Sequence, residues 1–351
     1  MDEARIEEFM GTVVGYMTGG AMCLAMWLGD ELGIYSTLAA AGPLTADDVA
    51  TKTNCNPRLI RELLDSNAAA HLLDYDDAND TYSISPEGTM ALADDNSPAF
   101  VARAMNAFGS FFMDFDKIKA AYQSPSGGLS WGDHDHRLFS GTEWFFRPGY
   151  RTFLPTMWIP ALDGVVAKLE AGAKVADVGC GHGASAIVMA ETWPNSNFYG
   201  FDFHGPSIDA SKERAKEAGV ANTTFAIADA KGYDGTYDLI CFFDCLHDMG
   251  DPVGIAKYAR EHLEPGGTIL LVEPYAHPDR VENMRENPMA PMMYLASAVI
   301  CTPNSLSQDV GLGLGAAAGA DKLKQVFIDA GFSHFRVAEE TPMNLVIEAK
   351  A

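Results

Sequence analysis

Val-Ala-Asp-Val-Gly-Cys-Gly-His-Gly, residues 175–183, is the stretch that decides the fold of this 351-residue chain. It begins as an apolar, β-branched run, and three glycines then stand at alternate positions. The apolar stretch 184–190 that follows has the composition of a helix. A strand that enters a helix through a glycine turn lets an α/β backbone touch a nucleoside-containing ligand. Side chains at Gly179, Gly181 or Gly183 would hold such a ligand off, so the turn predicts a nucleoside site.

Strands and helices alternate along the chain from residue 174 onward. Alternation of this kind predicts an α/β fold, a doubly wound Rossmann-like sheet of seven strands whose last strand is antiparallel. We expect its strands at 175–178, 197–201, 223–227, 237–243, 268–273, 333–339 and 344–349, with helices at 184–193, 207–217, 252–263 and 320–330.

The N-terminal part has a different, mostly helical pattern. Apolar residues recur at three- and four-residue steps within 3–38, Thr45 has the sequence context of a helix N-cap, and a further helix begins at Pro57. The stretch 72–84 has the pattern of a short hairpin. Helices followed by a β-wing are the order of a winged helix.

The charge of this winged helix argues against DNA binding. Residues 45–95 contain three basic and eleven acidic side chains, whereas binding by phosphate neutralisation needs the opposite sign. We therefore expect a winged helix used for dimerisation, in a homodimer. A ligand-sensing transcriptional regulator with a non-catalytic second domain is the alternative, and a salt-dependent shift of duplex DNA would favour it.

Composition predicts an acidic, cytoplasmic protein that binds neither nucleic acid nor membrane. The formal net charge is −24 and the sequence pI about 4.6, so nucleic acid and anionic membrane surfaces should repel it. The six cysteines form no Cys-x-x-Cys pair, and the N-terminus is acidic, unlike a targeting sequence. The apolar stretches 19–29 and 288–308 are too short or too interrupted to predict a membrane span.

Three segments have more than one interpretation. The aromatic run from Trp131 to Trp158 either lines a pocket or is core that joins two domains. The methionine-rich stretch 288–295 is a lid over an acceptor site or a core helix. The sequence Asp133-His134-Asp135-His136 is a local cluster without a distant partner, so we expect a solvated loop and no metal site.

Polar residues stand at the carboxyl ends of the predicted strands, where an open α/β sheet binds its ligand. Asp177 precedes the glycines, Asp202 ends the second strand and Asp229 follows the third. The fourth strand, 237–243, continues into Asp-Cys-Leu-His-Asp at 244–248. The glycine spacing alone also fits a nicotinamide dehydrogenase.

Taken together, these residues resemble the class I S-adenosylmethionine-dependent methyltransferases. The resemblance rests on the glycine turn, Asp202, Asp229, Leu-His-Asp at 246–248 and Leu-Glu-Pro-Gly-Gly at 263–267 in that order. The whole chain is similar to bacterial methyltransferases with an N-terminal winged-helix dimerisation domain and to small-molecule O-methyltransferases. The resemblance implies a dimerisation domain at 1–100, a helical bridge or acceptor-pocket wall at 101–160, and a cofactor-binding catalytic domain at 161–351.

The resemblance also implies a role for each site residue. Asp177 would hold the methionine end of S-adenosylmethionine, and Asp202 would bind the ribose diol with Phe203 beside the adenine. Asp229 and Ala230 would contact the adenine. The glycines would admit the ligand to the backbone, and the sulfonium side would be lined by Phe243 and Asp244.

His247 is the candidate catalytic residue. Methyl transfer to a hydroxyl of a small-molecule acceptor benefits from removal of the proton, and histidine suits this task near neutral pH. The related O-methyltransferases use the histidine at this place as the base, but their later acidic partner has no match within 280–310. A structural or substrate-contacting role for His247 therefore stays open.

Overall fold

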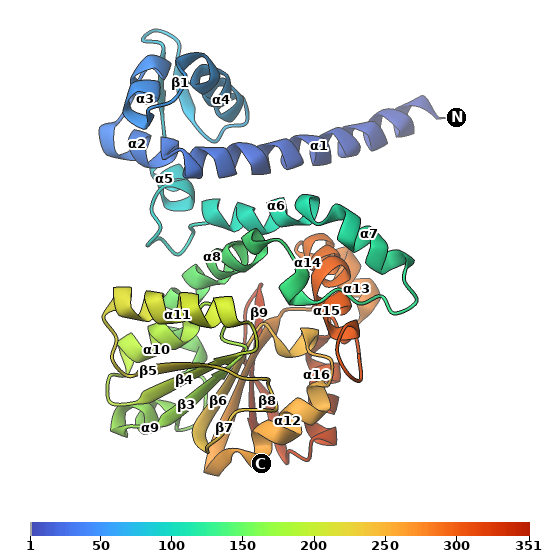
Figure 1. The fold of residues 1–351 in the computed structure, drawn as a ribbon. Coiled ribbons are helices and arrows are strands. Elements are labelled where there is room, and N and C mark those ends of the chain that lie inside the picture. Colours follow the sequence, from blue (N-terminus) through green and yellow to red (C-terminus); the bar gives the residue numbers. More distant parts are fainter. Residues whose placement is uncertain (1) are drawn as a thin grey trace. The chain divides into compact units, whose positions relative to one another are not determined.

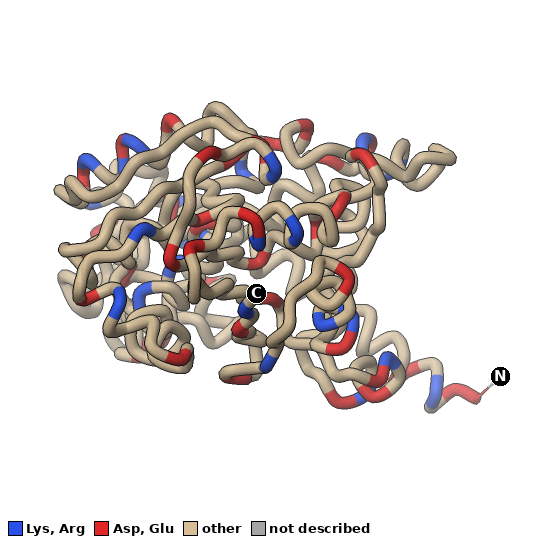
Figure 2. The backbone as a smooth tube through the Cα atoms, turned by 90° about the horizontal axis from the view of Figure 1, so that it is seen from below, with Lys and Arg blue, Asp and Glu red and all other residues tan. Residues whose placement is uncertain are grey.

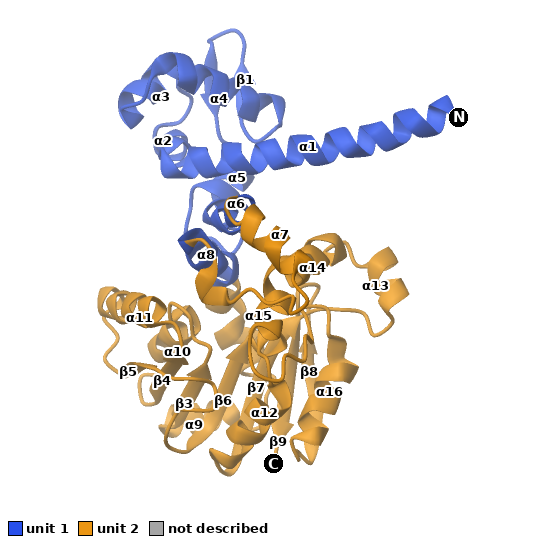
Figure 3. Ribbon diagram, turned by 45° about the vertical axis from the view of Figure 1, so that its right-hand side comes forward, with its two compact units in different colours: residues 1–112, 136–148 blue, residues 113–135, 149–351 orange. Residues whose placement is uncertain are grey.

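The computed structural model describes residues 2–351, which divide into two compact units. Unit 1 comprises residues 1–112 and 136–148, and unit 2 comprises residues 113–135 and 149–351 (Figure 3). The segment 101–160, which the sequence assigned to a bridge, is thus shared between the two units. Each unit has a hydrophobic core of its own.

Unit 1 is a helical winged-helix unit with a two-stranded wing (Figure 1). Thr45 accepts a hydrogen bond from the Asp48 amide and caps its helix as predicted. The core is formed by the inner faces of the short helices around Tyr82. The elements are α1 (Glu3–Glu31), α2 (Ile34–Ala41), α3 (Ala46–Thr53), α4 (Pro57–Ala69), β1 (Asp74–Asp76), β2 (Thr81–Ser83), α5 (Pro86–Leu92), η1 (Ala102–Ala104), most of α6 (Met105–Met113) and the first part of α8 (His136–Phe153).

Helix α1 is long and mostly exposed. Only Ala25 and Gly29 are buried along its 29 residues. By length and composition α1 could cross a membrane, whereas its apolar segment 19–29 alone is too short to predict a span. Its exposed surface includes large apolar side chains such as Phe9, Tyr16 and Met17.

Unit 2 contains a seven-stranded sheet in the order β5-β4-β3-β6-β7-β9-β8. The five strands β3 to β7 pair in parallel, and β9 is antiparallel to both of its neighbours, which confirms the predicted fold class. The strands are β3 (Lys174–Val178), β4 (Asn197–Asp202), β5 (Thr223–Ile227), β6 (Tyr237–Phe243), β7 (Leu263–Pro274), β8 (His334–Glu340) and β9 (Asn344–Lys350).

Helices cover both faces of this sheet (Figure 1). The apolar faces of α12 and α16 pack against alternate residues of β3, β6, β7 and β9, and α10 and α11 pack around Phe225 on β5. Strands covered on both faces need apolar residues in succession, and β3 and β6 show this pattern. The remaining elements are α7 (Phe115–Gln123), η2 (Trp131–Asp133), η3 (Leu154–Trp158), α9 (Val165–Ala171), α10 (Ala184–Thr192), α11 (Gly205–Ala218), η4 (Leu246–Asp248), α12 (Pro252–Glu261), α13 (Arg280–Glu286), α14 (Ala290–Ala296), η5 (Ser297–Cys301), α15 (Thr302–Leu306) and α16 (Gly319–Asp329).

Helix α8 begins at His136, the last residue of the Asp-His-Asp-His cluster. Within the segment 288–308, residues 290–306 form one nearly continuous helical stretch in which the wide turn η5 separates α14 from α15. Acidic positions outnumber basic ones along the chain, as its composition requires (Figure 2).

Candidate active site

The site lies at the carboxyl ends of four adjacent strands, β5, β4, β3 and β6. The predicted residues follow these ends one by one. Asp177 lies within β3, Asp202 ends β4, Asp229 follows β5, and Phe243 ends β6. Because neighbouring parallel strands end at one edge, the fold brings these residues to the same side of the sheet.

The three glycines of the turn after β3 differ in what a side chain at each position would contact. Their φ angles are +77° at Gly179, +51° at Gly181 and +78° at Gly183, a region that favours glycine. A Cβ at Gly183 would lie 2.8 Å from the Phe225 ring, and one at Gly179 would lie 3.0 Å from Cys245 Sγ. Nothing lies within 4 Å of a Cβ built at Gly181. Close packing therefore explains two of the glycines, and only Gly181 faces open space where a ligand could approach.

Asp202 fixes the glycine turn to the end of β4. Its two carboxylate oxygens accept hydrogen bonds from the Gly181 amide at 2.9 Å and from the His204 amide at 2.8 Å. Burial raises the pKa of this carboxyl, although these two bonds oppose the shift. Each carboxylate oxygen retains a further lone pair for a ribose hydroxyl. The neighbouring Phe203 is exposed and free of the core, as a ring that stacks on a base requires.

Asp177 is a buried carboxylate with one unused oxygen. Its Oδ2 accepts a hydrogen bond from Ser185 Oγ at 2.6 Å, and its Oδ1 has no partner among the described residues. Burial raises the pKa of Asp177 to about 7 despite the Ser185 bond. A buried, incompletely paired carboxylate is costly unless a cation or donor binds it. The ammonium group of a methionine moiety fits this requirement.

Asp244 has an even less satisfied carboxylate. Neither of its oxygens has a hydrogen-bond partner among the described residues, and its φ of 49° is unusual for aspartate. Burial and the nearby charge of Glu273 raise its pKa well above the ordinary value. The preceding Phe243 is buried, and its ring lies 5.4 Å from that of Tyr150. A sulfonium cation is a suitable neighbour for such a carboxylate.

Asp229 and Ala230 lie further out. Asp229 is exposed, and its Oδ1 accepts a hydrogen bond from the Lys231 amide at 2.9 Å, which is ordinary turn chemistry. Ala230 packs partly against the core. Their position beyond β5 is compatible with contact to a base, but the turn alone also accounts for the aspartate.

His247 is buried and has partners at both ring nitrogens. Nδ1 contacts Glu273 Oε2 at short hydrogen-bond range, and Nε2 lies 3.3 Å from Cys301 Sγ. Burial lowers the pKa of His247, but the charge of Glu273 and the contact with Cys301 outweigh it, so the pKa lies well above its usual value. The ring is therefore oriented and made more basic by a carboxylate.

Neither partner of His247 was predicted from the sequence. The acidic partner expected within 280–310 is instead Glu273, which lies in β7, the strand next to β6. A charged residue at the end of an otherwise apolar strand was the available signal. No sequence pattern points to Cys301.

The residues around His134 do not form the solvated loop that the sequence predicts, because His134 itself is buried. His134 lies 3.0 Å from the buried Asp114 carboxylate, which also accepts a bond from Lys117 at 2.8 Å. Among residues 2–351 no group of three or more metal-ligating side chains is gathered. In the aromatic segment, Tyr150 and Trp158 are buried against each other.

A glycine turn with acids at successive strand ends defines a nucleoside site of the methyltransferase class, and comparison with known proteins agrees. Residues 169–331 match the model of a methyltransferase domain family, and residues 20–94 match an Rv2258c-like winged helix-turn-helix domain. The chain thus carries an S-adenosylmethionine-dependent methyltransferase domain behind an Rv2258c-like winged helix-turn-helix domain. This confirms the predicted enzyme family and rejects the dehydrogenase interpretation.

Curated relatives match parts of the chain. A 2-methyl-6-phytyl-1,4-hydroquinone methyltransferase from Synechocystis is 28% identical over 209 residues, 57% of this chain and 63% of its own length. A 27-O-demethylrifamycin SV methyltransferase from Amycolatopsis mediterranei is 32% identical over 107 residues, 29% of this chain and 39% of its own length. The chain spans less than two thirds of the length of these relatives.

Solved structures share the fold over nearly the whole chain. Human N-acetylserotonin methyltransferase in complex with S-adenosylmethionine aligns with a TM-score of 0.71 at 19% identity, over 100% of this chain and 98% of its own. An O-methyltransferase family protein from Burkholderia thailandensis gives 0.71 at 16% identity, over 97% and 98%. Mitomycin 7-O-methyltransferase gives 0.69 at 17% identity, over the full length of both chains.

Proposed function

We propose that this protein transfers the methyl group of S-adenosylmethionine to a hydroxyl of a small-molecule acceptor. The observation that carries the proposal is the pairing of His247 with Glu273 at the same sheet edge as the incompletely paired carboxylates of Asp177 and Asp244. Several structural neighbours are described as O-methyltransferases, which supports a hydroxyl as the acceptor.

Different residues of this chain would bind different parts of S-adenosylmethionine. Asp177 would receive the ammonium group, Asp202 the ribose hydroxyls, and the backbone at Gly181 would lie against the ligand. The outer residues Asp229 and Ala230 border the base together with Phe203. S-adenosylmethionine, when bound, supplies a methyl group made electrophilic by its positively charged sulfur. The buried carboxylate of Asp244 faces this charge.

His247 acts as the general base. Glu273 holds Nδ1 and leaves Nε2 as the nitrogen that takes the proton of the acceptor hydroxyl. The charge of Glu273 raises the pKa of His247 and makes the ring a stronger base, but the ring has to lose its own proton before it can accept one, so turnover should rise with pH. Burial of the site excludes the water that would otherwise compete for this nitrogen.

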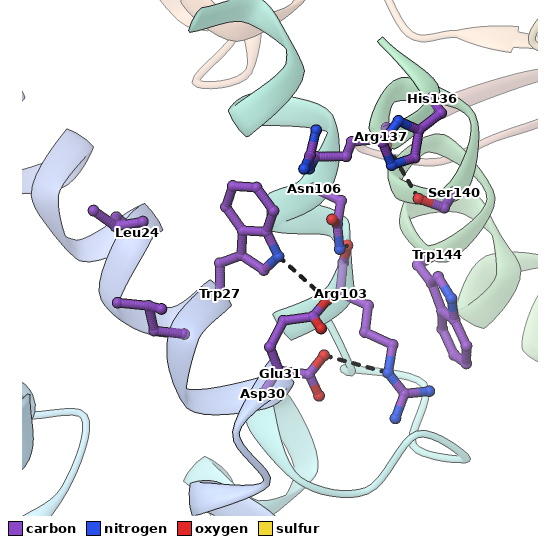
Figure 4. A pocket seen from close by; sticks show the side chains of 11 residues that line it. Leu24, Trp27, Asp30, Glu31, Arg103, Asn106, His136, Arg137, Ser140 and Trp144 are labelled. Atoms are coloured by element: carbon purple, nitrogen blue, oxygen red, sulfur yellow. Dashed lines mark hydrogen bonds and ion pairs between the residues drawn. The ribbon is translucent and has the colours of Figure 1, made fainter. Parts of the chain in front are cut away.

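The exposed face of α1 supports a homodimer as the working form. Its N-terminal half exposes Phe9, Met10, Val14 and Met17 beside the acidic residues Glu3, Glu7 and Glu8. A groove of about 810 Å³ within the same unit is walled by the C-terminal half of α1 and by residues of α6 and α8 (Figure 4). It combines aromatic rings with charges of both signs: Arg103 lies over Trp144 at 4.4 Å and Arg137 over Trp27 at 5.6 Å, and Asp30 and Glu31 also line it.

The charges of the groove balance one another, because Arg103 is ion-paired with Asp30 and Asp95 and Glu31 also lies in the lining. Its exposed aromatic rings are what suit the apolar side chains of α1, so the occupant we propose is α1 of a second copy. An anionic membrane is a poorer partner, because the two ends of α1 carry mainly acidic side chains. DNA is disfavoured by the excess of acids on the winged helix.

Calorimetric titration with S-adenosylmethionine tests the cofactor, and a screen for transfer of a labelled methyl group into extract metabolites tests the acceptor. We expect saturable binding and a labelled product whose methyl group is on oxygen. Absence of binding at millimolar S-adenosylmethionine would contradict the proposal, and a labelled nitrogen or sulfur would correct the acceptor atom.

A further inference from the structure

The thiol of Cys301 lies where the acceptor of the proposed reaction has to be. Its Sγ is 3.3 Å from Nε2 of His247, and the other ring nitrogen is held by Glu273. Both nitrogens are therefore occupied in the structure. The sulfur holds the hydrogen-bonding position at Nε2 that an acceptor hydroxyl would use.

The position of Cys301 over the imidazole is fixed by hydrogen bonds from the helix that follows it. Buried Asn304 donates from Nδ2 to the Asp248 carbonyl at 3.0 Å, and buried Ser305 donates from Oγ to the Met249 carbonyl at 3.0 Å. From the other side, the Gly315 amide donates to the His247 carbonyl at 3.1 Å. These bonds hold α15 in register with the turn that carries the base, so the contact is built into the fold.

Cys301 is also the last residue of η5, the wide helical turn between α14 and α15. Turns of this kind interrupt regular helical bonding and often lie at functional sites. The Ser297 hydroxyl at the other end of η5 binds the Ala316 amide at 3.1 Å, so the turn is anchored at both ends.

We propose that Cys301 is a positioning residue that covers Nε2 of His247 until an acceptor hydroxyl replaces it. This inference rests on the proposed function, since it gives the thiol a role in acceptor binding. A thiol is a weak hydrogen-bond donor and acceptor. The thiol gives the buried Nε2 a hydrogen-bond partner in place of water. A hydroxyl displaces it easily, because a hydroxyl makes a stronger hydrogen bond. The site thus selects acceptors whose nucleophile fits the small space of the sulfur.

A ¹⁵N NMR pH titration of the histidine side chains tests the contact without turnover. In the wild type we expect Nδ1 of His247 to stay protonated while Nε2 titrates. In Cys301→Ala the midpoint should fall, because the contact that helps to raise the pKa of His247 is lost. In Cys301→Ser the charge of the sulfur is lost but a hydrogen bond to Nε2 is kept, so the midpoint should lie between those of the wild type and Cys301→Ala. The variant His247→Gln assigns the signals, and Cys55→Ser in unit 1 is the control for loss of a thiol.

An unchanged midpoint in Cys301→Ala would overturn the inference, as would a midpoint in Cys301→Ser that matches the alanine variant. Rapid alkylation of Cys301 by iodoacetamide below pH 7 would also overturn it, since that behaviour identifies a thiolate nucleophile rather than a cover. If Cys301→Ala does not fold, the serine variant and the alkylation still decide the question. Calorimetry with S-adenosylmethionine on the same samples separates this outcome from failure of the proposed function.

Once an acceptor is known, Cys301→Ser gives a kinetic signature. A serine hydroxyl holds Nε2 more firmly than the thiol and competes better with the acceptor. We expect the acceptor KM to rise roughly 3- to 10-fold, the equivalent of one ordinary hydrogen bond, with kcat little changed. A fall in kcat at constant KM would show that the thiol acts during the reaction and would contradict its role as a cover.

Discussion

At the scale of single residues, the contact between His247 and Glu273 predicts that the histidine is essential for turnover. His247→Ala should lower turnover by roughly 10²- to 10⁴-fold, the usual contribution of a general base, while the Kd for S-adenosylmethionine stays unchanged. Calorimetry and a labelled-methyl assay on the same preparation measure both quantities. Unchanged turnover would leave His247 a structural residue.

Glu273→Gln should change the pH profile of the reaction. The charge of Glu273 raises the pKa of His247, so its removal lowers that pKa and moves the acid limb of kcat/KM to lower pH. The plateau should also fall, because a weaker base remains. Glu286→Gln on exposed α13 removes a charge of the same kind and should leave the profile in place. An acid limb that does not move would show that Glu273 does not control the pKa of the catalytic base.

Asp177 predicts a pH dependence of cofactor binding. Its folded-state pKa is raised to about 7, so the carboxylate is largely protonated below that pH and charged above it. The affinity for S-adenosylmethionine, whose ammonium pairs with the charged form, should therefore rise as pH passes through 7. Asp177→Asn should bind weakly and lose this dependence. An equally steep dependence in the asparagine variant would place the titrating group elsewhere.

At the scale of elements, the turn between β3 and α10 separates ligand binding from packing. Gly181→Ala places a methyl group in open space and should weaken S-adenosylmethionine binding, with a loss of stability of about 1 kcal/mol from its positive φ. Gly183→Ala meets the Phe225 ring and should lower the unfolding temperature much more. Thermal unfolding and calorimetry on both variants compare the two effects. Equal losses of stability would contradict the distinction.

At the scale of the whole molecule, the exposed helix α1 predicts self-association. Light scattering should give about twice the 37.8 kDa of one chain. The double variant Phe9→Glu and Met17→Glu places charges in the proposed contact and should yield monomers. Leu59→Glu alters a similarly exposed apolar residue of α4 in the same unit and should remain dimeric. A wild-type monomer at micromolar concentration would leave α1 without the partner proposed for it.

The amino-acid sequence by itself determined the sheet, the glycine turn and the acids at the strand ends. Those features depend on local patterns. Neighbouring residues determine where strands and helices alternate, where glycines permit a positive φ, and which residue follows each strand. The winged helix followed in the same way from its helix starts and wing.

Only the tertiary structure decided what surrounds His247. Glu273 and Cys301 lie 26 and 54 residues further along the chain, and no local pattern joins either of them to the histidine. Adjacent strands bring the first to one ring nitrogen, and a helix bound to the histidine's own turn brings the second to the other. The glycine turn could be recognised from the sequence, but of its three glycines the fold leaves only Gly181 facing open space, because Phe225 and Cys245 lie against the other two.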